Sequence, residues 1–174
     1  MTIQPDRRHP RRLVRTAVGP DFSWSPDGGS IAATRTRSHP GLYRFRVGGG
    51  RPVLLSDPIA QVVDPSWAVV QPAAAGGSPQ VAFVSTRDGV DDVYTMNPHG
   101  GGQRRLTVGA ATVPCSSRDQ SQLAYVAGAL AGTAASPSTL VVAGADGTGP
   151  TPSGHQDGLD RGARLVAGRS YDRL

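Results

Sequence analysis

A pattern that repeats three times along the chain limits the available folds more than any other feature. Ile31, Val81 and Leu123 mark equivalent points of the three copies, at spacings of 50 and 42 residues. A period of this size is typical of propellers and other repeat arrays. The repeat therefore predicts similar units, each of which needs neighbours to cover its apolar faces.

Each copy reads as four short extended runs separated by clusters of Gly, Pro and Asp. Such runs indicate an antiparallel meander, and the glycines at 28–29, 48–50 and 100–102 fit hairpin turns. All 18 basic residues are Arg and all 13 acidic residues are Asp. The Lys and Glu that usually fill exposed helix faces are absent, so we expect little helix.

Two stretches carry a family resemblance: WSPDG at 24–28 followed by Ile31 and Ala32, and VAFVSTRDG at 81–89 followed by VYTM at 93–96 and RRLT at 104–107. They resemble the WD40-like repeats of TolB-type β-propellers. The resemblance covers residues 11–151 and implies an all-β fold, an incomplete β-propeller of about three four-stranded antiparallel blades. The expected blade units are about 21–56, 64–107 and 112–151.

The copies depart from this pattern in several places. Copy 2 lacks the Ser-Pro-Asp-Gly after its Trp, and copy 3 has Ser116 in place of the Trp and Gln120 in place of the turn Gly. Residues 151–153 align with the fourth run of copy 2 but do not resemble it, so copy 3 is predicted to lack a fourth strand. Residues 11–14 do resemble that run, and we expect residues 11–17 to form an outer strand that completes the third blade of a second copy or of this chain.

Eight positions define the repeat and are predicted to be structural: Trp24, Pro26, Asp27, Gly28, Trp67, Asp88, Gly89 and Gly147. Both Trp side chains are expected to pack between blades, because they recur at one point of the repeat. The loop Asp residues are expected to form turns. A cation held by Asp88, Asp91 and Asp92 is the alternative, since calcium accepts clustered carboxylates.

No combination of residues indicates catalysis, a cofactor or a metal. A Gly-x-Ser-x-Gly nucleophile elbow is absent, and Cys115 is expected to be a small packed residue on the first strand of copy 3. The four His residues are scattered without the spacing of metal ligands. We therefore predict no enzymatic activity.

The two ends of the sequence differ from the repeats. Residues 1–10 are predicted to be a basic disordered arm and residues 152–174 a flexible tail. Residues 1–15 hold five Arg and one Asp of a formal net charge of +5, so the rest is close to neutral, which argues against nucleic-acid binding.

No apolar run spans a membrane and no signal peptide is evident, which predicts a cytoplasmic protein as written, or a periplasmic or extracytoplasmic one if the N-terminus is truncated.

The predicted function is a non-enzymatic scaffold that binds a protein partner, because TolB-type propellers serve protein complexes. A homodimer is possible, since two half-rings would close one propeller. Two alternatives remain open. The first is that the chain is the propeller module of a serine-hydrolase system that lacks its catalytic domain. The second is that it binds an anion or nucleic acid through the Arg arm.

Overall fold

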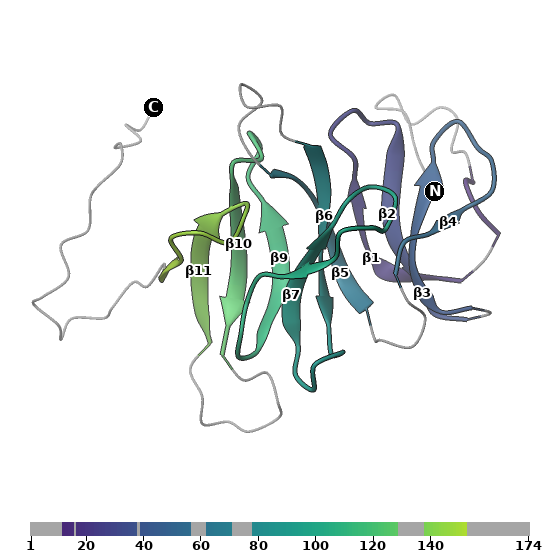
Figure 1. Cartoon of the computed structure of the whole chain (residues 1–174). Helices are drawn as coiled ribbons and strands as arrows, with labels where there is room; N and C mark the ends of the chain where they lie inside the picture. The colour runs from purple at the N-terminus through teal and green to yellow at the C-terminus, as the bar shows by residue number, and fades with distance from the viewer. Residues whose placement is uncertain are drawn as a thin grey trace, which may run out of the picture.

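The structure, a computed structural model, describes residues 12–15, 17–37, 39–56, 62–70, 78–128 and 138–152. They form three four-stranded antiparallel sheets, here called blades, that stand side by side in chain order from purple to yellow-green (Figure 1). The predicted all-β fold of about three four-stranded blades is confirmed. The predicted N-terminal arm and most of the predicted C-terminal tail lie outside the described residues. None of the described residues belongs to a helix long and apolar enough to cross a membrane.

The strands follow the chain from the inside of each blade outward. Blade 1 contains β1 (Val18–Trp24), β2 (Ser30–Arg35), β3 (Gly41–Arg46) and β4 (Val53–Leu54). Blade 2 contains β5 (Val62–Val70), β6 (Ser78–Ser85), β7 (Asp92–Met96) and β8 (Arg104–Arg105). Blade 3 contains β9 (Ala111–Ser116), β10 (Gln122–Ala127), β11 (Thr139–Gly144) and β12 (Thr151–Pro152).

The strand register confirms the repeat. The three residues that mark equivalent points pair with the same position of the preceding strand: Ile31 with Trp24, Val81 with Trp67, and Leu123 with Ser116. The inner strand of blades 2 and 3 also carries one extra residue at the same place, and Asp64 and Val113 adopt positive φ angles of 49° and 51° there. Such bulges increase the local twist of a strand.

Each blade has two faces that recur along the chain. The front face is formed by four positions on the second and third strands: Ile31, Ala33, Tyr43 and Phe45 in blade 1; Val81, Phe83, Tyr94 and Met96 in blade 2; Leu123, Tyr125, Val141 and Ala143 in blade 3. The back face is formed by the alternating positions, such as Ala32 and Leu42 in blade 1 and Ala82 and Val93 in blade 2. The back of blade 1 packs on the front of blade 2 in one buried cluster, and the back of blade 2 packs on the front of blade 3 in another.

The prediction that copy 3 lacks a fourth strand is wrong. Thr151 and Pro152 form β12, which pairs with Val142 and Val141 of β11. Proline is tolerated there because an outermost strand uses only one of its edges for pairing. The prediction that residues 11–17 complete a third blade is wrong as well, because β12 is already the outer strand of blade 3. Leu13 and Val14 form no strand and pack against the front face of blade 1.

Candidate functional site

The two contacts between blades use the same hydrogen bond near the inner strands. The Ser23 hydroxyl of blade 1 accepts a hydrogen bond of 3.0 Å from the backbone N–H of Trp67 in blade 2. Ser66, the equivalent serine of blade 2, accepts one of 3.1 Å from the N–H of Ser116 in blade 3. The third residue of this series is Cys115, because it pairs with Ala124 as Ser23 pairs with Ala32 and Ser66 with Ala82.

The outer parts of the blades also meet in a repeated way. Leu55, which follows β4, belongs to the cluster on the front face of blade 2, and Leu106, which follows β8, packs on the front face of blade 3. Gly100 of blade 2 lies so close to the Leu55 carbonyl that a Cβ there would collide with it, and Gly147 of blade 3 lies against Leu106. Neighbouring blades therefore interlock at their inner strands, their faces and their rims.

The front face of blade 1 is open. A pocket of about 470 Å³ lies over it, and its apolar lining includes Phe22, Trp24 and Ile31. Trp24 is 44% exposed and Phe22 is 62% exposed, whereas Trp67, at the place equivalent to Trp24, is 5% exposed. The prediction that Trp24 packs between blades is wrong, because no other blade covers its face among the described residues.

The back face of blade 3 is open as well. Leu140 is 48% exposed and Cys115 is exposed, whereas Leu42 and Val93, the equivalents of Leu140, are fully buried, and Ser66, the blade 2 equivalent of Cys115, is buried as well. The prediction that Cys115 is a packed residue is wrong, because its side chain lies on the one back face that no described blade covers. The described residues thus leave two apolar faces of opposite kind uncovered, the front of blade 1 and the back of blade 3.

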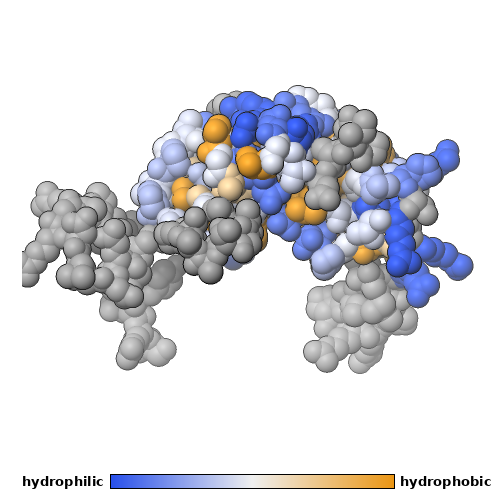
Figure 2. Space-filling model, turned by 90° about the horizontal axis from the view of Figure 1, so that it is seen from below, coloured by the Kyte–Doolittle hydropathy of each residue, from blue (hydrophilic) through white to orange (hydrophobic). Residues whose placement is uncertain are grey.

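The positive charge of the described residues is concentrated at one end. Seven Arg and two Asp belong to residues 12–56, whereas residues 108–128 and 138–152 hold one Arg and two Asp. Figure 2 shows strongly hydrophilic protrusions at the right-hand end of the molecule, where blade 1 stands. This asymmetry is not visible in the overall charge of the sequence, which suggested a nearly neutral body.

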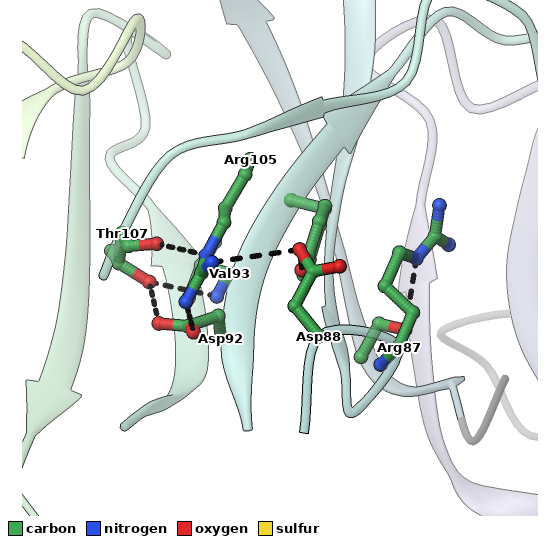
Figure 3. Close-up of polar contacts among 8 residues, drawn as sticks. Arg87, Asp88, Asp92, Val93, Arg105 and Thr107 are labelled. Carbon is green, nitrogen blue, oxygen red and sulfur yellow. Dashed lines mark hydrogen bonds and ion pairs between the residues drawn. The ribbon is translucent and has the colours of Figure 1, made fainter. Parts of the chain in front are cut away.

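A polar cluster on blade 2 has the densest network of charged contacts. The carboxylate of Asp92 is fully buried, and it accepts hydrogen bonds from the Arg105 guanidinium and the Thr107 hydroxyl. Thr107 Oγ1 in turn accepts a hydrogen bond of 2.9 Å from the N–H of Val93. Figure 3 shows Arg105 lying between Asp92 and Asp88.

The Asp88 carboxylate completes this cluster at the surface. It accepts a hydrogen bond of 2.5 Å from the Tyr94 hydroxyl and lies 3.5 Å from the Arg105 guanidinium. Burial raises the pKa of Tyr94 to about 12, and the hydrogen bond to Asp88 adds to this effect. Every carboxylate here is held by a cation or a hydroxyl of the same blade, and the bond between Asp92 and Arg105 joins β7 to β8.

Turns account for most of the remaining predicted positions. The Asp27 carboxylate accepts hydrogen bonds from the N–H of Gly29 and the hydroxyl of Ser25, and these bonds lower its pKa. Gly28 adopts a positive φ of 67° beside it, and Pro26 begins the same turn. Gly89 and Gly147 have φ angles of 95° and 86°. Asp88 also lies in a turn, which the Gly89 N–H closes on the Thr86 carbonyl, but its side chain contacts Tyr94 and Arg105.

Copy 3 reproduces the turn of copy 1 with other residues. Asp119 accepts hydrogen bonds from Ser117 and Ser121, which lower its pKa, and Gln120 has a φ of 62° where Gly28 has 67°. In the part of the chain that the structure describes, no group of three His, Cys or acidic residues is arranged to hold a metal ion. The alternative reading of Asp88, Asp91 and Asp92 as cation ligands therefore has no structural support.

Sequence reasoning missed Asp92, Arg105 and Thr107 as partners. Asp92 directly precedes an apolar strand, and the Arg and Thr of the RRLT run follow 13 and 15 residues later. The sequence signal for this polar cluster is an acidic residue at the start of one strand, with an Arg on the next strand and a Thr shortly after it. The serine series was missed because Ser23 and Ser66 occur where any small residue would fit the pattern.

Comparison with known proteins gives the fold. The chain matches the putative TolB from Agrobacterium tumefaciens with a TM-score of 0.65 and 18% identity, over 80% of this chain and 50% of that chain. A chain of a nidogen/laminin complex matches with a TM-score of 0.50 and 11% identity, over 76% of this chain and 46% of that one. No protein-family model and no curated protein matches. The chain spans about half the length of these two solved structures, and over that length it has the fold of a TolB-like β-propeller.

Proposed function

We propose that the chain is a non-enzymatic β-propeller scaffold that binds a protein partner through the open faces of its end blades. The observation that carries this proposal is the exposure of Phe22 and Trp24 over an apolar pocket. At the equivalent place of blade 2, Trp67 is buried by a neighbouring blade. A face built for packing against protein is thus left open.

The composition of this face supports protein recognition. Contiguous exposed apolar surface marks interaction sites on soluble proteins, and aromatic residues together with Arg are enriched at interfaces. Phe22 and Trp24 supply the aromatic surface, and Arg15 and Arg35 border a second hollow beside Leu13 and Val14. Large aromatic side chains seated in pockets contribute most of the free energy of binding in many complexes.

The fold itself leaves the partner open, because propellers serve many functions. One of the matched structures is a nidogen/laminin complex, and we propose protein recognition for this chain too. We assign it no catalytic residue. Cys115, the one thiol, has a single weak contact of 3.9 Å to the Ser116 carbonyl, and none of the hydrogen bonds among the described residues joins it to a base that would activate a nucleophile.

Photo-crosslinking in cells of the source organism tests the proposal. A benzophenone amino acid is placed at Phe22 on the front of blade 1, at Leu140 on the back of blade 3, or at Val108, which is 87% exposed on a loop. We expect a discrete crosslinked product from position 22 or 140, identified by mass spectrometry, and none from position 108. Equal products from all three positions, or no product from any, would contradict the proposal.

A further inference from the structure

We infer that the partner of each open face is a second copy of this chain, with the back of blade 3 in one copy covering the front of blade 1 in the other. Used twice, this head-to-tail contact closes two half-rings into one propeller. The inference rests on the proposed function and names its partner. Heterologous contacts of this kind form closed rings when the rotation between copies closes.

The inner strands carry the first argument. The hydroxyls of Ser66 and Ser116 lie 3.2 Å apart across the contact between blades 2 and 3. Cys115 is equivalent to Ser66, and Trp24 is equivalent to Ser116, by the strand register. The next contact of the same kind therefore joins Cys115 of one copy to Trp24 of the other, and the Cys115 sulfur stands where a serine hydroxyl accepts the backbone N–H.

The faces carry the second argument. The back of blade 1 buries Trp67, and the back of blade 2 buries Leu123. The back of blade 3 presents the same alternating positions, with Leu140 where Leu42 and Val93 stand in the other blades. No described blade covers these positions in blade 3. A second copy brings the one front face that lacks a neighbouring blade.

The rim carries the third argument. Leu13 packs on the front face of blade 1 as Leu55 and Leu106 pack on the front faces of blades 2 and 3. Those two leucines directly follow the outer strand of the preceding blade. In the head-to-tail contact the preceding outer strand is β12 of the other copy, so Leu13 lies at its end.

Charge favours the head-to-tail arrangement over one in which the blade 1 faces of two copies meet. Blade 1 holds seven Arg and two Asp within residues 12–56, so two blade 1 faces brought together repel each other. The described residues of blade 3 hold one Arg and two Asp. A contact between blade 1 and blade 3 avoids this repulsion.

A crosslink between single positions tests the register. The Trp24→Cys variant places a thiol opposite Cys115 of the other copy, and Ser116 shows that a small residue is accepted at this position. Oxidised glutathione is added as the oxidant. For each disulfide that forms, one molecule of it takes up the two electrons and two protons that the two thiols lose. We expect a reducible covalent dimer that contains both disulfides. The Val108→Cys variant is the matched control and should form no covalent dimer.

Three outcomes of that experiment overturn the inference. If Trp24→Cys forms no covalent dimer, the proposed register is wrong. If Val108→Cys forms dimers to the same extent, the crosslink reports collision and not a contact. A ladder of higher oligomers shows a head-to-tail contact that does not close, which contradicts the ring.

Complementation tests the direction of the contact on the full chain. Trp24→Asp damages only the front of blade 1, and Leu140→Asp damages only the back of blade 3; both side chains are half-exposed in one copy, so each variant should fold. Light scattering should give twice 18.0 kDa for the wild type, and each variant should dissociate with a constant at least about tenfold higher. Mixing the two variants restores one intact contact and should recover association.

Failure of complementation would contradict the head-to-tail contact, because a dimer that joins the same face of both copies is not rescued by mixing. Failure of this inference also differs from failure of the proposed function. If positions 22 and 140 crosslink to another protein while the purified chain stays at 18.0 kDa at all concentrations, the scaffold function stands and the second copy is excluded. If nothing is crosslinked, both are wrong.

Discussion

Blades 1 and 2 place a tryptophan at the same position of the sheet, yet the two side chains have different surroundings. Both pair with a β-branched aliphatic residue on the next strand, Ile31 in blade 1 and Val81 in blade 2. Trp67 is covered by the back of blade 1, whereas Trp24 faces a pocket. A repeat unit thus determines where an aromatic residue stands, and its neighbour determines whether that residue is buried.

The largest difference between these two blades should appear in the free energy of unfolding when each Trp is replaced by Ala. Trp67→Ala removes a buried side chain from the cluster between blades, and such truncations lower the free energy of unfolding by about 3–5 kcal/mol. Trp24→Ala should cost less than about 1 kcal/mol in the isolated chain, because its site is already open to water. Urea midpoints at low protein concentration measure both. Equal shifts would show that the neighbour does not determine burial.

The polar cluster around the buried Asp92 of blade 2 should give the second largest change in stability. Asp92→Asn weakens the hydrogen bonds to Arg105 and Thr107 and should lower the free energy of unfolding by about 1.5–3 kcal/mol. Asp88→Asn is the control on the same cation and should cost about 0.5 kcal/mol or less, because its side chain is half-exposed. Denaturant titrations of both variants check the order, and the opposite order would show that Arg105 is held mainly from the surface.

Much of this architecture can be predicted from the sequence, because it depends on local features. Turn residues and strand lengths repeat along the chain, and they are enough to align Ile31 with Val81 and Leu123 and to give three sheets. The outer strand β12 was missed because it consists of two residues, one of them Pro152, so neither periodicity nor propensity marks it. The exposure of Trp24 and Cys115 was missed because it depends on what lies beside the end blades, which no local pattern encodes.

The hydrogen bonds between the inner strands predict a smaller difference in stability between covered and uncovered faces. Ser23→Ala and Ser66→Ala each remove a hydrogen bond between blades, and each should lower the free energy of unfolding by about 0.5–1.5 kcal/mol. Cys115→Ala, at the third position of the series, should leave the stability of the single chain unchanged, because its face is open there. Thermal unfolding measures all three. A loss for Cys115→Ala as large as for Ser66→Ala at low concentration would mean that the thiol is already packed.

Acid dependence should give the smallest effect, and it has opposite signs in different parts of the molecule. Turn hydrogen bonds hold the pKa of Asp27, Asp119 and Asp146 below the ordinary value of 3.8. Their stabilisation is present above that value and is lost as the pH falls through the lowered pKa. Melting temperatures should therefore fall on acidification below about pH 4, and less so in the Asp27→Asn variant.

Asp64 should behave in the reverse way. Burial raises its pKa, and the nearby Asp21 adds to the shift. Its protonated form is favoured in the folded state, so the stability that it contributes is lost as the pH rises from 3.8 through the raised pKa. Asp64→Asn should raise the melting temperature at pH 7 and leave it unchanged at pH 3. A lower melting temperature at pH 7 would show that the charge at the inner strand is stabilising.

The interlocking of each blade with its immediate neighbours has a consequence for how the molecule comes apart. Blades 1 and 2 meet through one buried cluster and blades 2 and 3 through another. In the single copy present at low protein concentration, cooperativity passes only from neighbour to neighbour along this one-dimensional array, so unfolding starts at the ends. Amide hydrogens of β6 and β7 in the middle blade should exchange with solvent last, and those of β2 and β10 should exchange earlier, through partial openings in which one end blade has detached.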